Sequence, residues 1–119
     1  MAAAKYSGFS TWCWFDTNGV GGCTRSPVIR AVVRENGTEI AMDCDNAVPG
    51  TPAEIYAISL RMNGGSHHTG TWKTGKGLAP NSGTCEGDVF SNQSGYVLIG
   101  TWTEDGSEHV WYVHLSKEQ

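Results

Sequence analysis

Residues 96–115 read YVLIGTWTEDGSEHVWYVHL, and this stretch decides the fold. Asp105-Gly106 stands between two runs in which apolar side chains alternate with others. A two-residue type I′ turn requires positive φ at both central positions, and its twist matches that of paired strands. The stretch therefore predicts an antiparallel β-hairpin that turns at Asp105-Gly106.

Pairing outward from this turn predicts the register of the hairpin. One face carries four opposed pairs: Trp102 beside His109, Gly100 opposite Trp111, Leu98 opposite Val113, and Tyr96 opposite Leu115. On this register, Gly100 is expected to leave room for the Trp111 ring. The reverse face is also apolar and carries Val97, Ile99, Val110 and Tyr112.

A second hairpin is expected over residues 27–44, where Asn36-Gly37 occupies the turn. The predicted apolar face pairs Val33 with Ile40, Ala31 with Met42, and Ile29 with Cys44. The opposite face pairs Arg34 with Glu39 and Arg30 with Asp43. Turn chemistry, alternation and charge agree on this register.

The middle of the chain predicts further strands joined by loops. Residues 45–52 form a loop, and residues 54–62 form a strand with Tyr56, Ile58, Leu60 and Met62 on one side. The next strand spans about 66–73, and its register stays open because either Asn63-Gly64 or Gly64-Gly65 can occupy the turn. Residues 74–83 are expected to be the most mobile connection, followed by a short strand near 84–90.

About eight strands and no substantial helix predict an all-β antiparallel meander, either a small barrel or a sandwich. The 119 residues form one domain, residues 1–119, in which residues 1–6 are expected to be a flexible N-terminal segment. Sixteen glycines and five tryptophans suit short strands joined by tight turns.

Three short segments echo one another: Ser10-Thr11-Trp12, Gly70-Thr71-Trp72 and Gly100-Thr101-Trp102. We interpret them as favourable strand sequence rather than as an internal repeat. Gly-x-Trp resembles a motif of the avidins and lipocalins, which are small ligand-binding barrels. Those families carry the motif in their first strand, whereas its clearest copy here lies in the last hairpin, so the resemblance implies no binding residue.

The four cysteines allow three pairings, and none lies in a Cys-x-x-Cys motif. A three-residue loop Thr17-Asn18-Gly19 would place Cys13 opposite Cys23 for a disulfide and leave Cys44 and Cys85 as a second pair. The alternative is four reduced, buried cysteines in a cytosolic protein. The compartment therefore stays open between a cytoplasmic form with free thiols and a mature secreted form with disulfides.

Net charge and hydropathy limit the classes of partner that we expect. A net charge of −4 and a pI near 5.4 disfavour nucleic acid, which requires clustered Lys and Arg. No apolar run reaches the length that crosses a bilayer, so we expect a soluble protein without a membrane partner.

Motifs for metals, cofactors and catalysis are weak. His67 and His68 point to opposite faces of a strand, and so do His109 and His114, so neither pair can chelate one ion. Gly19-Val20-Gly21-Gly22 lacks the Lys-Ser/Thr of a phosphate loop. We expect no metal, no cofactor and no recognisable catalytic set.

The aromatic residues point to a function. We expect a non-enzymatic binding domain that holds a small organic ligand or carbohydrate in an aromatic-lined cavity, with binding residues Trp72, Trp102, His109 and Trp111. The alternative is an interaction or structural module, monomeric or homo-oligomeric, that uses a strand edge or the apolar face Val97-Ile99-Tyr112-Val110. An enzyme of unidentified class is the third hypothesis.

Overall fold

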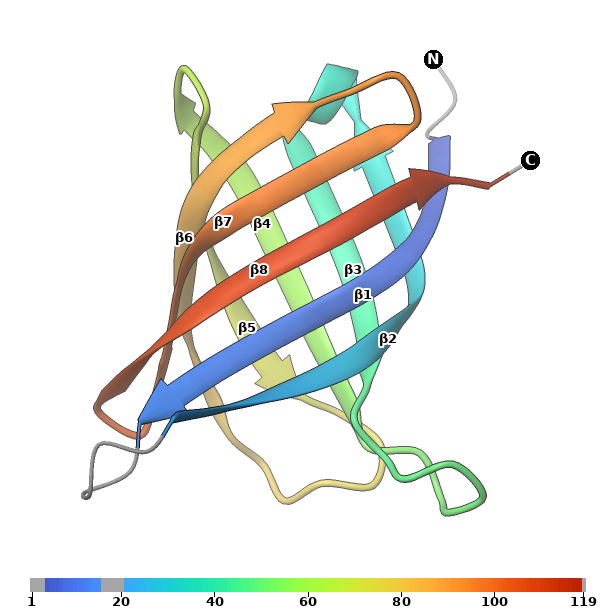
Figure 1. Cartoon of the computed structure of the whole chain (residues 1–119), viewed down its shortest axis with the longest axis vertical. Coiled ribbons are helices and arrows are strands. Elements are labelled where there is room, and N and C mark those ends of the chain that lie inside the picture. The colour runs from blue at the N-terminus through green and yellow to red at the C-terminus, as the bar shows by residue number, and fades with distance from the viewer. Residues whose placement is uncertain (1–3, 16–20, 119) are drawn as a thin grey trace.

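A computed structural model describes residues 4–15 and 21–118, which form a closed barrel of eight antiparallel strands (Figure 1). Each strand pairs with its neighbours in sequence, and β8 pairs with β1. The strands are β1 (Ala4–Phe15), β2 (Gly21–Arg34), β3 (Glu39–Asp45), β4 (Ile55–Gly64), β5 (His67–Thr74), β6 (Ser82–Ser91), β7 (Gly95–Glu104) and β8 (Ser107–Lys117). The predicted all-β meander is confirmed, and the barrel form is decided over the sandwich.

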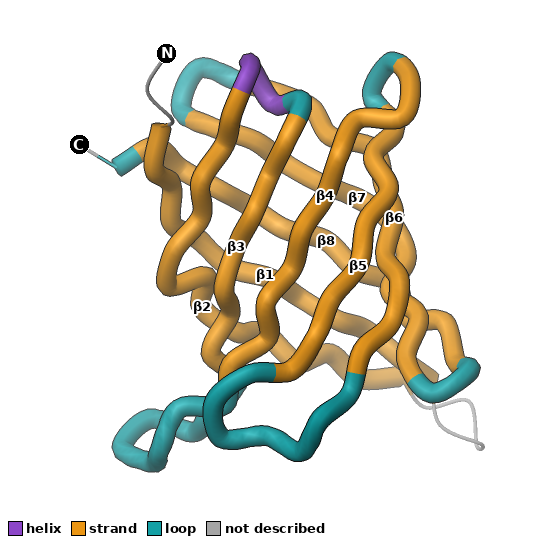
Figure 2. The backbone as a smooth tube through the Cα atoms, turned by 180° about the vertical axis from the view of Figure 1, so that it is seen from behind, coloured by secondary structure: helices purple, strands orange, loops and turns teal. Residues whose placement is uncertain are grey.

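The two ends of the barrel differ (Figure 2). The longer loops, residues 46–54 and 75–81, lie at one end together with the turn Asp105-Gly106, and we call this the loop end. The other end, the turn end, holds the 3-10 turn Glu35–Gly37, the short turns at 65–66 and 92–94, and both ends of the described chain.

The last hairpin has the predicted register. All four opposed pairs are present, and Asp105 and Gly106 have φ of 51° and 81° as a type I′ turn requires. The expected role of Gly100 is wrong in detail. A Cβ at Gly100 would overlap the carbonyl oxygen of Glu86 and the Cα of Gly87, so the glycine makes room for the backbone of β6 rather than for the Trp111 ring.

The second hairpin is confirmed near its turn and shifts further out. Asn36 and Gly37 have positive φ, and Val33 faces Ile40 as predicted. The pairing of Ile29 with Cys44 is wrong: a bulge leaves Ile29 52% exposed and pairs Val28 with Cys44. An extra residue bends a strand, and this bend helps the sheet to close.

Charged pairs cover the outer face of this hairpin. Arg30 forms an ion pair with Asp43 at 3.3 Å, as the register predicted. Arg34 lies opposite Glu39, but the Glu39 carboxylate bonds Arg61 on β4 at 3.0 Å.

The β4–β5 turn differs from both alternatives that the sequence left open. Gly64 pairs with His67 and Met62 with His68, so Gly65 and Ser66 occupy the turn. A bulge between Met62 and Gly64 shifts the register, because Gly64 and Gly65 both accept positive φ.

His68 points inward from this turn and is buried. Its Nδ1 lies 2.8 Å from the Ser66 carbonyl oxygen, and its Nε2 lies 2.6 Å from that of Gly37. The ring thus joins two turns at the turn end of the barrel.

Two segments contain more strand than expected. β1 begins at Ala4, so Ala4, Lys5 and Tyr6 of the expected flexible segment belong to a strand, while residues 1–3 lie outside the described residues. The strand predicted near residues 84–90 is longer, because β6 pairs on both sides over Ser82–Ser91. In the loop that precedes β6, residues 75–81, the Asn81 amide donates a hydrogen bond to the Thr74 hydroxyl at 2.8 Å.

One cysteine pair forms a disulfide and the other two cysteines are free, so each of the two interpretations is right for one pair. Cys13 and Cys23 are opposite each other on β1 and β2 and form the predicted disulfide, whereas the loop Thr17-Asn18-Gly19 lies outside the described residues. The second predicted bridge is wrong. Cys44 on β3 and Cys85 on β6 are free and buried, because β4 and β5 separate their strands.

Candidate functional site

Five aromatic rings from different strands form one cluster inside the loop end of the barrel. Trp102 is its centre: it stacks on Trp72 at 4.8 Å between ring centroids with 15° between the planes. Trp12, Trp111 and Tyr56 meet Trp102 edge-on at 5.2, 5.3 and 6.0 Å. The tryptophans of the three echoed segments, Trp12, Trp72 and Trp102, therefore come together although the first and the last stand 90 positions apart.

Hydrogen bonds fix most of these rings. The indole N–H groups of Trp72, Trp102 and Trp111 donate to the Thr103 carbonyl, the Glu104 carboxylate and the Ser10 hydroxyl, at 3.0, 2.9 and 2.8 Å. Among the residues that the structure describes, the buried N–H of Trp12 has no partner. A buried donor without an acceptor is unfavourable, so its presence beside a cavity points to a functional position.

A cavity of about 240 Å³ opens above this cluster at the loop end, and we call it the mouth cavity. Four of its lining residues are aromatic and four are polar: Trp12, Trp14, Tyr56 and Trp102, with Thr24, Asn46, Glu104 and His109. Trp102 is 1% exposed and forms the floor, whereas Trp14 is 40% exposed at the rim.

The mouth cavity has an acidic character. Glu104 lines it, and no Lys or Arg is among the described residues that do so. Burial raises the pKa of the Tyr56 hydroxyl, and the carboxylates of Glu104, Glu54 and Asp105 raise it further.

The loops around the cavity are held by side-chain hydrogen bonds. Asp45 Oδ1 accepts from the amides of Ala47 and Glu54, both at 3.0 Å, and these bonds lower the pKa of the Asp45 carboxyl. Ser26 Oγ donates to Asn46 Oδ1 at 2.6 Å. The polar rim residue Asn46 is thus positioned by the wall behind it.

The structure brings the four predicted binding residues together but gives them different places. Trp102 and His109 line the mouth cavity. Trp72 and Trp111 do not line it; they are 1% and 0% exposed and pack against the Trp102 ring.

The predicted binding residues include only two of the eight described residues that line the cavity. Trp12 and Trp14, which share a face of β1, line the cavity but are not among the predicted binding residues. Thr24, Asn46, Tyr56 and Glu104 come from β2, the β3–β4 loop, β4 and β7, and no local pattern marks them. Only the closing of the barrel places these positions side by side.

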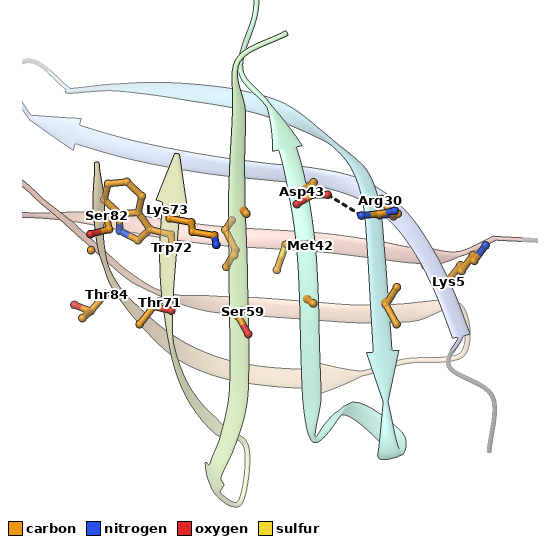
Figure 3. A pocket seen from close by; sticks show the side chains of 15 residues that line it. Lys5, Arg30, Met42, Asp43, Ser59, Thr71, Trp72, Lys73, Ser82 and Thr84 are labelled. Carbon is orange, nitrogen blue, oxygen red and sulfur yellow. Dashed lines mark hydrogen bonds and ion pairs between the residues drawn. The ribbon is translucent and has the colours of Figure 1, made fainter. Parts of the chain in front are cut away.

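A larger hollow of about 830 Å³ lies on the outer face of β2 to β6 (Figure 3). Exposed Ser59 lies near its middle, with Lys5 and Arg30 on one side and Thr71 and Lys73 on the other. Arg30 is already paired with Asp43. We interpret this hollow as the concave exterior of a twisted sheet, because most of its lining side chains point away from the barrel interior.

Other functional centres are not found in the described part of the chain. No group of three His, Cys, Asp or Glu residues there could hold a metal ion. None of its helical segments is long and apolar enough to cross a membrane.

The fold and the site together define a small closed β-barrel with an acidic, aromatic-lined cavity at one end. Comparison of the chain with protein-family models, with curated proteins and with solved structures finds no match.

Proposed function

We propose that this protein is a non-enzymatic binding domain that holds a small organic ligand, or the apolar face of a sugar, in the mouth cavity. The observation that carries the proposal is the lining: four aromatic rings and four polar side chains converge at one end of a rigid barrel. Ligand sites are usually concave, mostly apolar and supplied with a few placed polar groups.

The size of the cavity limits the ligand. Its volume of about 240 Å³ lies just below the range of about 300–1,000 Å³ that is typical of sites for drug-sized molecules. A ligand with a single ring, or a compact branched group of similar size, fits this volume.

The polar groups suit binding better than catalysis. Glu104 and His109 both line the cavity, but the Glu104 carboxylate accepts the Trp102 N–H at 2.9 Å. This bond orients an aromatic wall and leaves the carboxylate as a fixed charge.

A ligand screen monitored by tryptophan fluorescence tests the proposal, with small aromatic, aliphatic, charged and sugar compounds as probes. Hits are then measured against Trp14→Ala, which removes the exposed rim ring of the cavity. We expect this change to weaken binding about tenfold, since the ring supplies contact area at the rim.

Phe9→Ala is the matched control, because Phe9 is similarly exposed (42%) but does not line the cavity. Binding that survives Trp14→Ala as well as it survives Phe9→Ala would place the ligand elsewhere. A screen without any hit would contradict the proposal.

A second candidate function is association through the outer face of β7 and β8. Ile99, Val110 and Tyr112 of this face are 56%, 56% and 44% exposed in the isolated chain. Apolar side chains grouped on one surface often mark an interaction site. The other surface suggested for this candidate, a strand edge, is lost within the described chain, because the pairing of β8 with β1 closes the sheet.

A further inference from the structure

We propose that the ligand of the mouth cavity is a small organic cation, such as a quaternary or methylated ammonium group. This inference rests on the proposed function and adds the charge and shape of the ligand.

The aromatic lining suits a cation. Trp12, Trp14, Tyr56 and Trp102 line one small cavity, and indole is the aromatic group that attracts cations most strongly. The face of an aromatic ring carries partial negative charge, so several rings around one cavity favour a compact positive group. Methylated ammonium groups also bury apolar surface against such walls.

The carboxylates at and near the cavity also favour a cation. Glu104 lines the cavity, and Glu54 and Asp105 act on the Tyr56 hydroxyl that also lines it. The nearby loop of residues 75–81 carries Lys76, but this side chain is exposed and outside the lining. His109 is the one basic side chain among the described residues that line the cavity.

Two of the acceptor atoms in the lining are already engaged, which counts against a sugar. A sugar needs several free donors and acceptors around its hydroxyl groups. Here Asn46 Oδ1 already accepts from Ser26, and Glu104 Oε1 already accepts from Trp102. A carboxylate keeps its negative charge while one of its oxygens accepts a hydrogen bond, so the engaged Glu104 still attracts a cation.

Isothermal titration calorimetry with three probes tests the inference: choline chloride, its neutral isostere 3,3-dimethylbutan-1-ol, and methyl glucoside. The first two have nearly the same shape, so their difference reports the charge. We expect choline to bind about tenfold or more tightly than the isostere. Equal or tighter binding of the isostere or of the glucoside would overturn the inference and leave the proposed function standing.

A lack of binding by all three probes at millimolar concentration would also overturn the inference. The broader fluorescence screen would then decide the proposed function separately, because its probes include neutral and anionic compounds.

Two variants with the same change in net charge test whether the preference for a cation arises at the cavity. Glu104→Gln removes the charge but keeps an acceptor for Trp102, and we expect it to weaken choline about fivefold or more while binding of the isostere is unchanged. Glu118→Gln alters an exposed residue at the turn end and should change neither. Equal weakening by both variants would show that only the overall charge of the protein matters, which would overturn the inference.

Discussion

At the scale of single residues, the cysteines form two pairs of different chemistry. Cys13 and Cys23 are joined in a disulfide, whereas Cys44 and Cys85 keep their thiols inside the barrel. Burial raises the pKa of each free thiol from 9.0 to about 12. At Cys44 a hydrogen bond with Ser10 opposes this shift, and the charge of Asp43 adds to it. Both residues therefore act as small apolar core residues.

These thiols predict a loss of stability in alkali. Below pH 9 both thiols are protonated whether the chain is folded or unfolded. Between pH 9 and 12 the unfolded chain loses these protons while the folded chain keeps them, so the free energy of unfolding falls as the pH rises. We expect a slope that approaches about 1.4 kcal/mol per pH unit for each thiol.

Urea unfolding between pH 7 and pH 10 measures this slope, and Cys85→Ala should reduce it by about half just above pH 9. The hydroxyls of Tyr56 and Tyr96, whose pKa values burial also raises from 10.0, add to the fall at higher pH. Stability that stays constant across this range would contradict the prediction.

At the scale of elements, glycines allow neighbouring strands to approach closely where the sheet coils. Gly100 on β7 lies opposite Gly87 on β6, and a side chain at Gly100 would overlap the Glu86 carbonyl oxygen. Gly70 on β5 stands in the same relation to the Ser59 carbonyl oxygen of β4. Glycine within strands often marks such bends in barrels.

Gly100→Ala should therefore destabilise the barrel by about 1–3 kcal/mol, the usual effect of overpacking. Gly75→Ala is the control: its new Cβ would lie 3.6 Å from Ile55, an ordinary contact, and stability should change by no more than about 0.5 kcal/mol. Chemical denaturation of both variants and the parent measures the difference. Similar stabilities for the two variants would contradict the prediction, because β6 would then shift without cost to accept the new Cβ.

At the scale of the whole molecule, closure of the barrel pairs the edges of the sheet and leaves its outer face for contacts. The outer face of β7 and β8 continues onto β1, where Phe9 lies opposite His114 and is 42% exposed. The mouth cavity opens at the loop end, so a partner on this face leaves the cavity accessible.

If association through this face is the function, the protein should sediment as a dimer or larger assembly. Ile99→Lys should shift it to the monomer, because a charge on each copy opposes burial of the face. Val48→Lys is the control, since Val48 is 70% exposed in the β3–β4 loop, away from the outer face of β7 and β8. A wild-type protein that remains monomeric at high concentration in sedimentation equilibrium would exclude this candidate.

The sequence alone determined the hairpins and most of their registers. Asp105-Gly106 and Asn36-Gly37 are turns because positive φ is a local requirement, and alternation assigns faces because successive strand residues point in opposite directions. These features depend on residues that are close in the chain. The same reasoning placed Trp102 beside His109 and Cys13 opposite Cys23.

The tertiary structure decided everything that depends on how the strands assemble. The separation of Cys44 from Cys85 follows from the order of the strands in the closed sheet, and no turn residue marks the bulge beside Ile29. The mouth cavity has the same origin: its lining comes from five strands and a loop, and its residues meet only when β8 pairs with β1. Closure is a cooperative property of all eight strands, so no local stretch of sequence carries it.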